Sequence, residues 1–247
     1  MTGHTATSGG RLAEPAATAN PVCVALDFDD PERIRTVAAA TSEHVGVFKI
    51  GLTAFASAGP GIVEELSARL PVFLDLKFHD IPAQVQGAVR AAARTGARYT
   101  TVHASGGTAM IGAAVEAAGE SLTVLAVTVL TSLDDEALDD IGLRGPSRDA
   151  VLRLAGVALG AGAPGLVCSP REVAALREAF GTRAGGGPLL VVPGIRGSGE
   201  AAGDQKRTTS ATEALAAGAD LIVVGRPITA APDPGAAAAA LHAEIRS

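Results

Sequence analysis

Short apolar, β-branched segments recur along the chain and alternate with longer alanine-rich segments. The apolar segments have the length and composition of buried strands, whereas the alanine-rich segments have those of helices. Eight strands are predicted at residues 22–27, 45–50, 72–77, 99–103, 123–129, 166–169, 189–193 and 221–225. Helices are predicted between them at residues 31–40, 62–69, 85–95, 108–118, 148–159, 170–180 and 209–217.

Residues that favour helix ends support this division. Ser169 stands before Pro170, and hydroxyl residues at 208–210 precede another helix, as expected for N-terminal caps. Glycines that favour helix ends follow three of the predicted helices, at Gly96, Gly119 and Gly218. The alternation of strands and helices is therefore expected to be regular.

Eight strands that alternate with helices predict the α/β class and a (β/α)8 TIM barrel. The length of 247 residues fits one such barrel, which needs about 250 residues. A doubly wound open sheet is the alternative, but Asp27-Phe28-Asp29 follows the first strand where a Gly-x-Gly-x-x-Gly turn would be expected. We expect one barrel domain over residues 21–247 and a flexible, small and polar extension over residues 1–20, without a signal-peptide core.

Composition and charge argue against several classes of partner. The formal net charge is −6 and no basic run occurs, so a nucleic acid is not expected to bind. Cys23 and Cys168 lie in apolar segments and are expected to be buried thiols of a cytoplasmic protein. The longest uncharged stretch, residues 154–170, is interrupted by Gly160 and Pro164, which favours a helix, a turn and a strand over a membrane span.

Charged residues gather where the predicted strands end. Asp75 and Lys77 share one face of their strand, because side chains alternate along a strand. Barrel interiors are normally filled by Val, Ile and Leu, and buried ions are costly unless they are paired. Two opposite charges on the inner face therefore indicate a site.

The other strands also end in polar residues. The first ends in Asp27, the second in Lys49, the fourth in His103, and the fifth in Thr128 and Thr131. Catalytic groups of such barrels come from the C-terminal ends of several strands. Two acids and two lysines are thus predicted to converge on one mouth of the barrel.

The last two strands are followed by glycine-rich loops, at residues 192–199 and 224–228. In many barrels these two loops bind a phosphate through backbone N–H groups and a helix N-terminus. Gly225 permits close approach of the backbone, and Arg226 supplies a fork of donors for phosphate oxygens. An anionic ligand is predicted there.

Taken together, these segments resemble the orotidine 5'-phosphate decarboxylase family, bacterial type, whose members make uridine monophosphate. The resemblance runs from residue 22 to about residue 234. It is carried by Ala25-Leu26-Asp27, Phe48-Lys49-Ile50-Gly51, Asp75-Leu76-Lys77-Phe78-His79-Asp80-Ile81-Pro82, His103-Ala104-Ser105-Gly106-Gly107, Val127-Thr128-Val129-Leu130-Thr131-Ser132, Pro193-Gly194-Ile195-Arg196, Gly203-Asp204-Gln205-Lys206-Arg207 and Gly225-Arg226-Pro227. Asp-x-Lys-x-x-Asp alone also fits sister decarboxylases, whereas the Ile-Pro extension and the two phosphate loops are more specific.

The resemblance implies a catalytic tetrad of alternating charge, formed by Lys49, Asp75, Lys77 and Asp80. Asp80 would enter the site from the partner subunit of a homodimer with shared active sites. Lys77 would be the proton donor. Asp75 would lie near the substrate carboxylate, and whether it acts by repulsion or by positioning the lysines is left open, with positioning favoured.

The resemblance also implies the residues that bind orotidine 5'-phosphate. These are Asp27, Lys49, Asp75, Thr131, Ser132, Pro193, Arg196, Gln205, Gly225 and Arg226. Asp27 and Lys49 would hold ribose hydroxyls, and Thr131 and Ser132 would lie near the pyrimidine. Arg196, Gln205, Gly225 and Arg226 would bind the phosphate.

The implied reaction needs no cofactor. Loss of carbon dioxide from C6 leaves an electron pair in the ring plane, which a carbonyl cannot delocalise, so the site must stabilise the charge. The Lys77 ammonium beside C6 can stabilise this carbanion and then protonate it. His79 and His103 are interpreted as structural, and no cluster of metal-ligand spacing predicts a metal.

One position departs from the family pattern. After Asp80-Ile81-Pro82 the family usually has Asn-Thr, and its Thr contributes to the neighbouring subunit's ribose site. This chain has Ala83-Gln84 instead. Gln84 lacks the hydroxyl of the usual Thr but keeps a hydrogen-bond donor and an acceptor. For that reason alone it is predicted to contact the substrate.

Two other functions stay open from the sequence. A phosphosugar decarboxylase or aldolase of the same barrel superfamily shares the pattern of Asp75, Lys77 and Asp80 but typically needs Mg²⁺, so a chelator discriminates it. A non-catalytic protein that binds a nucleotide or sugar phosphate would keep the phosphate loops. The intact tetrad argues against that second alternative.

Overall fold

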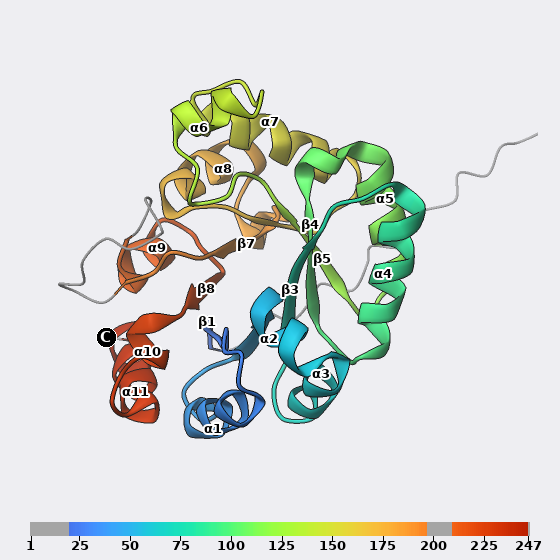
Figure 1. Ribbon diagram of the computed structural model, residues 1–247. Helices are drawn as coiled ribbons and strands as arrows, with labels where there is room; N and C mark the ends of the chain where they lie inside the picture. The colour runs from blue at the N-terminus through green and yellow to red at the C-terminus, as the bar shows by residue number, and fades with distance from the viewer. Residues whose placement is uncertain (1–19, 197–208, 247) are drawn as a thin grey trace, which may run out of the picture.

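The structure, a computed structural model, describes residues 20–196 and 209–246. Its eight parallel strands close into a barrel in sequence order, with β8 hydrogen-bonded to β1. The strands are β1 Val22–Ala25, β2 Val47–Gly51, β3 Val72–Phe78, β4 Tyr99–His103, β5 Thr123–Val127, β6 Gly165–Val167, β7 Leu189–Val192 and β8 Leu221–Val224. Figure 1 shows the strands at the centre and the helices around them. The predicted (β/α)8 TIM barrel is confirmed.

The helices include all seven that the sequence predicts, with shifted ends. They are α1 Pro31–Thr41, α2 Leu52–Ala58, α3 Pro60–Ser67, α4 Pro82–Arg94, α5 Gly107–Ala118, α6 Asp135–Asp140, α7 Ser147–Gly160, α8 Val173–Phe180, α9 Ala211–Ala216, α10 Arg226–Thr229 and α11 Pro234–Glu244. Single 3₁₀ turns lie at Ala104–Gly106, Pro170–Glu172 and Arg183–Gly185. The sequence did not predict α2, α6, α10 and α11. Three of these are too short to show a helical period, and α11 is nearly uniform alanine, which carries little periodicity.

The predicted helix signals lie at helix ends. Ser169 and Ser210 each form a capping box, with Glu172 and Glu213 respectively. Gly119 ends α5 with a φ of 56°, a backbone conformation that glycine adopts without the steric cost of a side chain. Local capping chemistry therefore defined these boundaries.

Two layers of apolar side chains stabilise the barrel. The outer layer lies between the strands and the helices and includes Phe48 and Leu74. The inner layer fills the barrel with Cys23, Ala25, Val47, Phe73, Tyr99, Leu125, Leu189, Val191, Leu221 and Val223. Phe73 and Tyr99 meet edge to face, with ring centroids 6.3 Å apart. Consecutive residues such as Val47 and Phe48 thus belong to opposite layers, as strand alternation requires.

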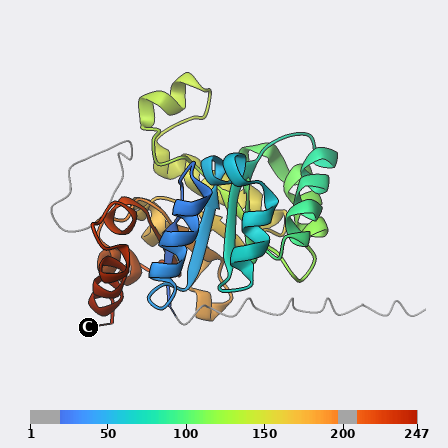
Figure 2. The ribbon, with the colours of Figure 1, turned by 60° about the horizontal axis from the view of Figure 1, so that its bottom comes forward.

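The segment between β5 and α7 extends beyond the rest of the barrel. It carries α6, whose first turn is capped by the Asp134 side chain accepting from the Ala137 N–H. Figure 2 shows this segment projecting at one end of the molecule. Because it follows β5, that end is the C-terminal end of the strands, where barrel enzymes carry their sites.

Two expectations about the chain's surroundings can be compared with the structure. Cys23 and Cys168 are both buried, as predicted. Burial raises the pKa of the Cys23 thiol far above its ordinary value, so this thiol is not ionised at neutral pH. Within residues 20–196 and 209–246, none of the helices is long and apolar enough to cross a membrane.

Candidate active site

A cavity of about 520 Å³ opens at the C-terminal end of the barrel. Its wall contains residues from β1, β2, β3, β5 and the segments that follow β5 to β8. A cavity of this size suits a small-molecule ligand. The predicted site residues that line it are Asp27, Lys49, Asp75, Lys77, Thr131, Pro193, Arg196, Gly225 and Arg226.

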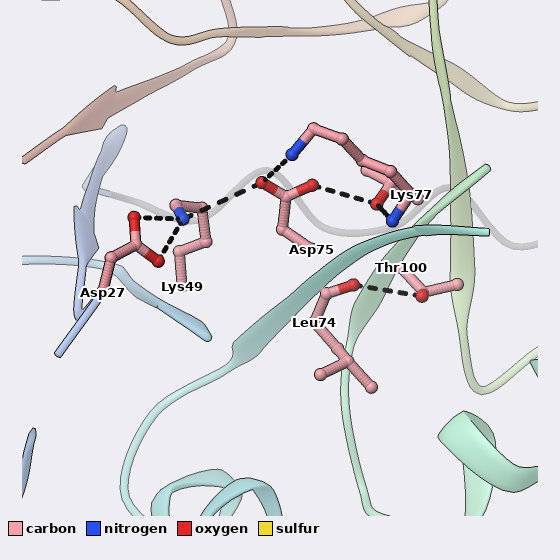
Figure 3. A network of polar contacts seen from close by, with 7 residues as sticks. Asp27, Lys49, Leu74, Asp75, Lys77 and Thr100 are labelled. Carbon is pink, nitrogen blue, oxygen red and sulfur yellow. Dashed lines mark hydrogen bonds and ion pairs between the residues drawn. The ribbon is translucent and has the colours of Figure 1, made fainter. Parts of the chain in front are cut away.

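Four charged side chains form a continuous row in this cavity, here called the charged row: Asp27, Lys49, Asp75 and Lys77. Lys49 Nζ lies 2.8 Å from both carboxylate oxygens of Asp27. It also lies 3.8 Å from Asp75 Oδ2, which accepts from Lys77 Nζ at 2.8 Å. Figure 3 shows this alternation of acid and base, from Asp27 after β1 to Lys49 on β2 and to Asp75 and Lys77 on β3. The predicted convergence of two acids and two lysines is therefore confirmed.

Burial and mutual attraction together set the ionisation of the row. Lys49 is 7% exposed and Asp75 is 9% exposed, so water screens this part of the row little. Burial disfavours the Asp75 carboxylate, yet the ammonium groups of Lys49 and Lys77 outweigh it and hold the Asp75 pKa below its ordinary value. Burial likewise disfavours the Lys49 ammonium, and Asp27 and Asp75 hold the Lys49 pKa above its ordinary value. Lys49 and Asp75 are therefore both charged near neutral pH.

The end of β3 departs from regular strand geometry. Leu74 pairs with Thr100 and Phe78 pairs with Val102. A separation of four residues along β3 therefore corresponds to only two residues along β4. Within this bulge Lys77 has a φ of 50°, in the left-handed region that residues with side chains rarely adopt. Strain of this kind concentrates at functional sites. The bulge places both Asp75 and Lys77 in the cavity wall.

Gly51 gives the Asp27 carboxylate room beside Lys49. A Cβ at Gly51 would lie 2.4 Å from Asp27 Oδ1 and 3.0 Å from Lys49 Nζ. Any larger residue would therefore push the Asp27 carboxylate away from its present position. The contact between Asp27 and Lys49 therefore requires glycine at residue 51.

The segments after β7 and β8 also line the cavity. Arg196 is held by backbone hydrogen bonds, because its N–H donates to the Thr209 carbonyl at 3.0 Å. Gly194, with a φ of 85°, turns the chain out of β7. Gly225 precedes α10, whose first residue is the exposed Arg226. Two arginines and a backbone turn thus face the same cavity as the charged row.

Three comparisons with known proteins agree on the family. A family model described as "Orotidine 5'-phosphate decarboxylase / HUMPS family" matches residues 20–241. The chain belongs to this family. A relative from Anaeromyxobacter sp. (strain K), named orotidine 5'-phosphate decarboxylase, is 57% identical over 226 residues, which cover 91% of this chain and 97% of the relative. A relative of the same name from Thermobifida fusca (strain YX) is 53% identical over 230 residues, 92% of this chain and 97% of the relative.

Solved structures of the family share this barrel. Orotidine 5'-phosphate decarboxylase from Lactobacillus acidophilus superposes with a TM-score of 0.80 at 38% identity, covering 92% of this chain and all of that one (100%). The protein of the same name from Pyrococcus horikoshii OT3 gives a TM-score of 0.74 at 26% identity, covering 92% of this chain and 99% of that one. The family resemblance inferred from the motifs is confirmed.

Other residues predicted from the decarboxylase resemblance lie outside the cavity wall. Asp80, Gln84 and Ser132 are exposed, and none of the three lines the cavity. Asp80 Oδ1 accepts from the Ile81 N–H at the turn after β3. Gln205 lies outside the residues that the structure describes. The roles of these four residues in orotidine 5'-phosphate decarboxylases stay predictions for this chain.

Two polar strand ends turn away from the cavity. Thr128 is buried, and its hydroxyl donates to the Val167 carbonyl at 3.0 Å, so it links β5 to β6. His103 packs beside His79, with ring centroids 5.3 Å apart. Burial, then the neighbouring charges of His79 and Lys77, hold the pKa of His103 below its ordinary value. Neither residue lines the cavity, which agrees with the interpretation of His103 as structural.

The sequence reasoning missed two residues of the cavity wall, Phe28 and Arg33. The Arg33 guanidinium carbon lies 4.5 Å from the centre of the Phe28 ring, a cation–π distance. Phe28 lies in the loop between β1 and α1 and Arg33 lies in the first turn of α1, and segments in that position line the sites of this fold. Their place directly after a strand end was the available signal.

Within the described part of the chain, the acidic, histidine and cysteine side chains form no group of three or more suited to hold a metal ion. The acids of the charged row are each paired with a lysine rather than with one another. A lysine ammonium is a poor neighbour for a cation. The donor set thus suits an anionic or polar organic ligand.

Proposed function

We propose that this protein catalyses the decarboxylation of orotidine 5'-phosphate to uridine 5'-phosphate, without a cofactor, in de novo pyrimidine biosynthesis. The observation that carries the proposal is the charged row in the wall of a cavity that Arg196 and Arg226 also line. A substrate with a phosphate at one end and a carboxylate on its ring suits such a cavity. Family membership adds independent support.

Lys77 has the central role in the proposed reaction. When the C6 carboxylate leaves as carbon dioxide, the bond pair stays on C6 in the ring plane, and the Lys77 ammonium stabilises it by charge. Lys77 then donates a proton to C6, which completes the product. Preorganised charge of this kind is often the largest contribution to catalysis. The Asp75 carboxylate, 2.8 Å from Lys77 Nζ, keeps that ammonium in place.

We assign Asp75 mainly to positioning. Its Oδ2 faces both lysine ammonium groups, at 2.8 Å from Lys77 and 3.8 Å from Lys49. A carboxylate whose charge is shared in this way repels a second carboxylate less than an isolated one would. Asp27 and Lys49 would bind the ribose hydroxyls, and Thr131 would lie beside the pyrimidine.

The decisive experiment follows the ultraviolet absorbance of orotidine 5'-phosphate with purified protein and excess chelator. Loss of absorbance at an enzymatic rate supports the proposal. Turnover that disappears with the chelator and returns with Mg²⁺ would point to the phosphosugar branch of this superfamily. Binding of uridine 5'-phosphate without turnover would instead make the protein a nucleotide-binding module.

Phosphate binding is tested with Arg226→Ala. We expect kcat/KM for orotidine 5'-phosphate to fall by on the order of 100-fold, because charge-assisted hydrogen bonds to the phosphate are lost. The slow reaction of the phosphate-free nucleoside should stay almost unchanged. Equal losses with both substrates would place Arg226 in the chemistry or the fold.

We propose further that the protein is a cytoplasmic homodimer whose sites are shared. Asp80 is exposed just after the bulge of β3, next to Ile81, which is 64% exposed. Leu52, at the start of α2, is 61% exposed. Exposed large apolar side chains, one of them next to an acid that does not line its own cavity, suit a contact with a second copy of the chain.

Mixing two inactive variants tests the shared site. In a hybrid of Lys77→Ala with Asp80→Ala, one site carries both defects and the other carries neither. With random reassortment about half the dimers are hybrids with one good site of two, which gives roughly a quarter of wild-type activity. Subunit exchange is shown by co-purification of differently tagged chains. Exchange without recovery of activity would mean that Asp80 acts within its own chain.

A further inference from the structure

We propose that Thr101 is a positioning residue of the active site, whose hydroxyl fixes the Lys77 backbone and the Asp75 carboxylate relative to each other. The inference rests on the proposed function, because it names a residue that prepares the same charged row for that reaction. Thr101 lies on β4, is fully buried, and does not line the cavity. Any effect it has on catalysis must therefore act through its neighbours.

The Thr101 hydroxyl makes two hydrogen bonds, and both reach residues of the charged row. It accepts from the Lys77 N–H at 2.8 Å. It donates to Asp75 Oδ1 at 3.0 Å. A hydroxyl has only one proton to donate, and the Thr101 hydroxyl donates it to Asp75. One oxygen atom therefore joins the main chain of the proton donor to the side chain of its carboxylate partner.

The bond to Lys77 compensates for the bulge in β3. Regular pairing of β3 with β4 is interrupted between Leu74 and Phe78. Within that gap the Lys77 N–H has a side-chain acceptor from β4 in place of a strand carbonyl. Buried N–H groups require a partner, and a φ of 50° persists only where the surroundings enforce it. The Thr101 hydroxyl supplies part of that enforcement.

The bond to Asp75 decides which way the carboxylate faces. With Oδ1 held by Thr101, Oδ2 is directed to Lys77 Nζ at 2.8 Å and Lys49 Nζ at 3.8 Å. Rotation of the carboxylate would break the bond with Thr101 and lengthen at least one ion pair. The Lys77 ammonium is thereby positioned twice, once through its backbone and once through its counter-ion.

The neighbouring residue Thr100 provides a matched control. It is also fully buried, and its hydroxyl also bonds to β3, donating to the Leu74 carbonyl at 3.1 Å. Figure 3 shows this contact beside Asp75 and Lys77 but separate from the charged row. Thr100 and Thr101 point to opposite faces of β4, because adjacent residues of a strand alternate. Removing either hydroxyl costs a buried hydrogen bond, but only Thr101 touches the row.

The test compares Thr101→Val, Thr101→Ser and Thr100→Val by steady-state kinetics and thermal unfolding. For Thr101→Val we expect kcat to fall on the order of 10- to 100-fold, the loss typical of a misplaced catalytic group, with KM within about threefold of wild type. Thr101→Ser keeps the hydroxyl and should retain kcat within about threefold. Thr100→Val should lower the unfolding temperature but leave kcat within about threefold. Thr101→Ala, which cannot overpack the site, replaces Thr101→Val if the valine variant does not fold, with the same expected loss.

Three results would overturn the inference: kcat within about threefold of wild type in the hydroxyl-free variant, an equal loss of kcat in Thr100→Val, or no recovery in Thr101→Ser. The proposed function fails in a different way, as a wild-type protein without turnover of orotidine 5'-phosphate. In that case binding of uridine 5'-phosphate and the crystal structure of the Thr101 variant still decide whether Asp75 and Lys77 move. Unchanged positions of Asp75 and Lys77 in that structure would also count against Thr101.

Discussion

Two successive levels of the barrel interior differ sharply in chemistry although the same three strands build both. The lower level contains Val47, Phe73 and Tyr99, all members of the apolar inner layer. The upper level contains Lys49, Asp75 and Thr101, each two residues further along the same strand. Strand alternation directs both sets inward.

The lower level stabilises the fold, whereas the upper level forms part of the active site. At the lower level, edge-to-face contact of Phe73 and Tyr99 buries large apolar area. At the upper level, burial opposes both charges, and each persists because an opposite charge lies beside it. Substitutions at the lower level should therefore change stability, and substitutions at the upper level should change chemistry.

The strongest test of this contrast is Lys77→Ala, at the upper edge of the interior. We expect kcat to fall by at least about 10⁴-fold, or about 5.5 kcal/mol in barrier, because the proposed proton donor is lost. Binding of uridine 5'-phosphate should persist, since the phosphate and ribose contacts lie elsewhere. Calorimetric titration and thermal unfolding serve as controls. Turnover within about tenfold of wild type would refute the role of Lys77.

Leu125→Ala tests the lower level. Leu125 is fully buried inside the barrel and does not line the cavity. We expect the free energy of unfolding to fall by about 2–5 kcal/mol through lost contacts and a cavity, measured by urea denaturation. Turnover of the folded protein at low temperature should change by less than about threefold. Leu125→Met, which conserves volume, is the matched control, and a kcat loss without a stability loss would reverse our assignment of the two levels.

Gly51→Ala sharpens the boundary between stability and chemistry. The new Cβ would displace the Asp27 carboxylate, which is the free end of a flexible side chain, so the fold should remain stable. We expect KM for orotidine 5'-phosphate to rise about tenfold, or about 1.4 kcal/mol, as the ribose contact is disturbed. Gly61→Ala in α3 is the control, because nothing lies within 4 Å of its added Cβ. Identical kinetics for both variants would contradict the function assigned to Asp27.

The smallest expected effect is a pH dependence of stability. The Asp75 pKa is lower in the folded protein than its ordinary value near 3.8, so Asp75 contributes stability above that value and loses it as the pH falls through the folded pKa. Below about pH 4 the unfolding free energy of the wild type should therefore fall more steeply than that of Asp75→Asn. Urea denaturation across acidic pH measures both slopes. Parallel slopes would show that Asp75 is not stabilised as a carboxylate.

Local pattern predicted the barrel well, because each strand and each cap depends on neighbours in sequence. Ser169 and Ser210 capped the helices as predicted, and alternation placed Asp75 and Lys77 on one face. The short helices α6 and α10 escaped prediction, since so few residues show no period. The contact that the Thr128 hydroxyl makes with β6 could not be read from the sequence, because a hydroxyl at a strand end can bond to either neighbouring strand or face the cavity.

The sequence by itself determined the number and order of the strands, the charged residues at their ends and the family, because periodicity and motif spacing are properties of the chain alone. It left undetermined how Asp75 and Lys77 reach their present positions. That depends on the bulge of β3 against β4 and on the Thr101 hydroxyl, which meets them from a strand 24 and 26 residues away in sequence. Only the closed barrel brings those groups within hydrogen-bonding distance, and for that reason only the tertiary structure decided the geometry of the site.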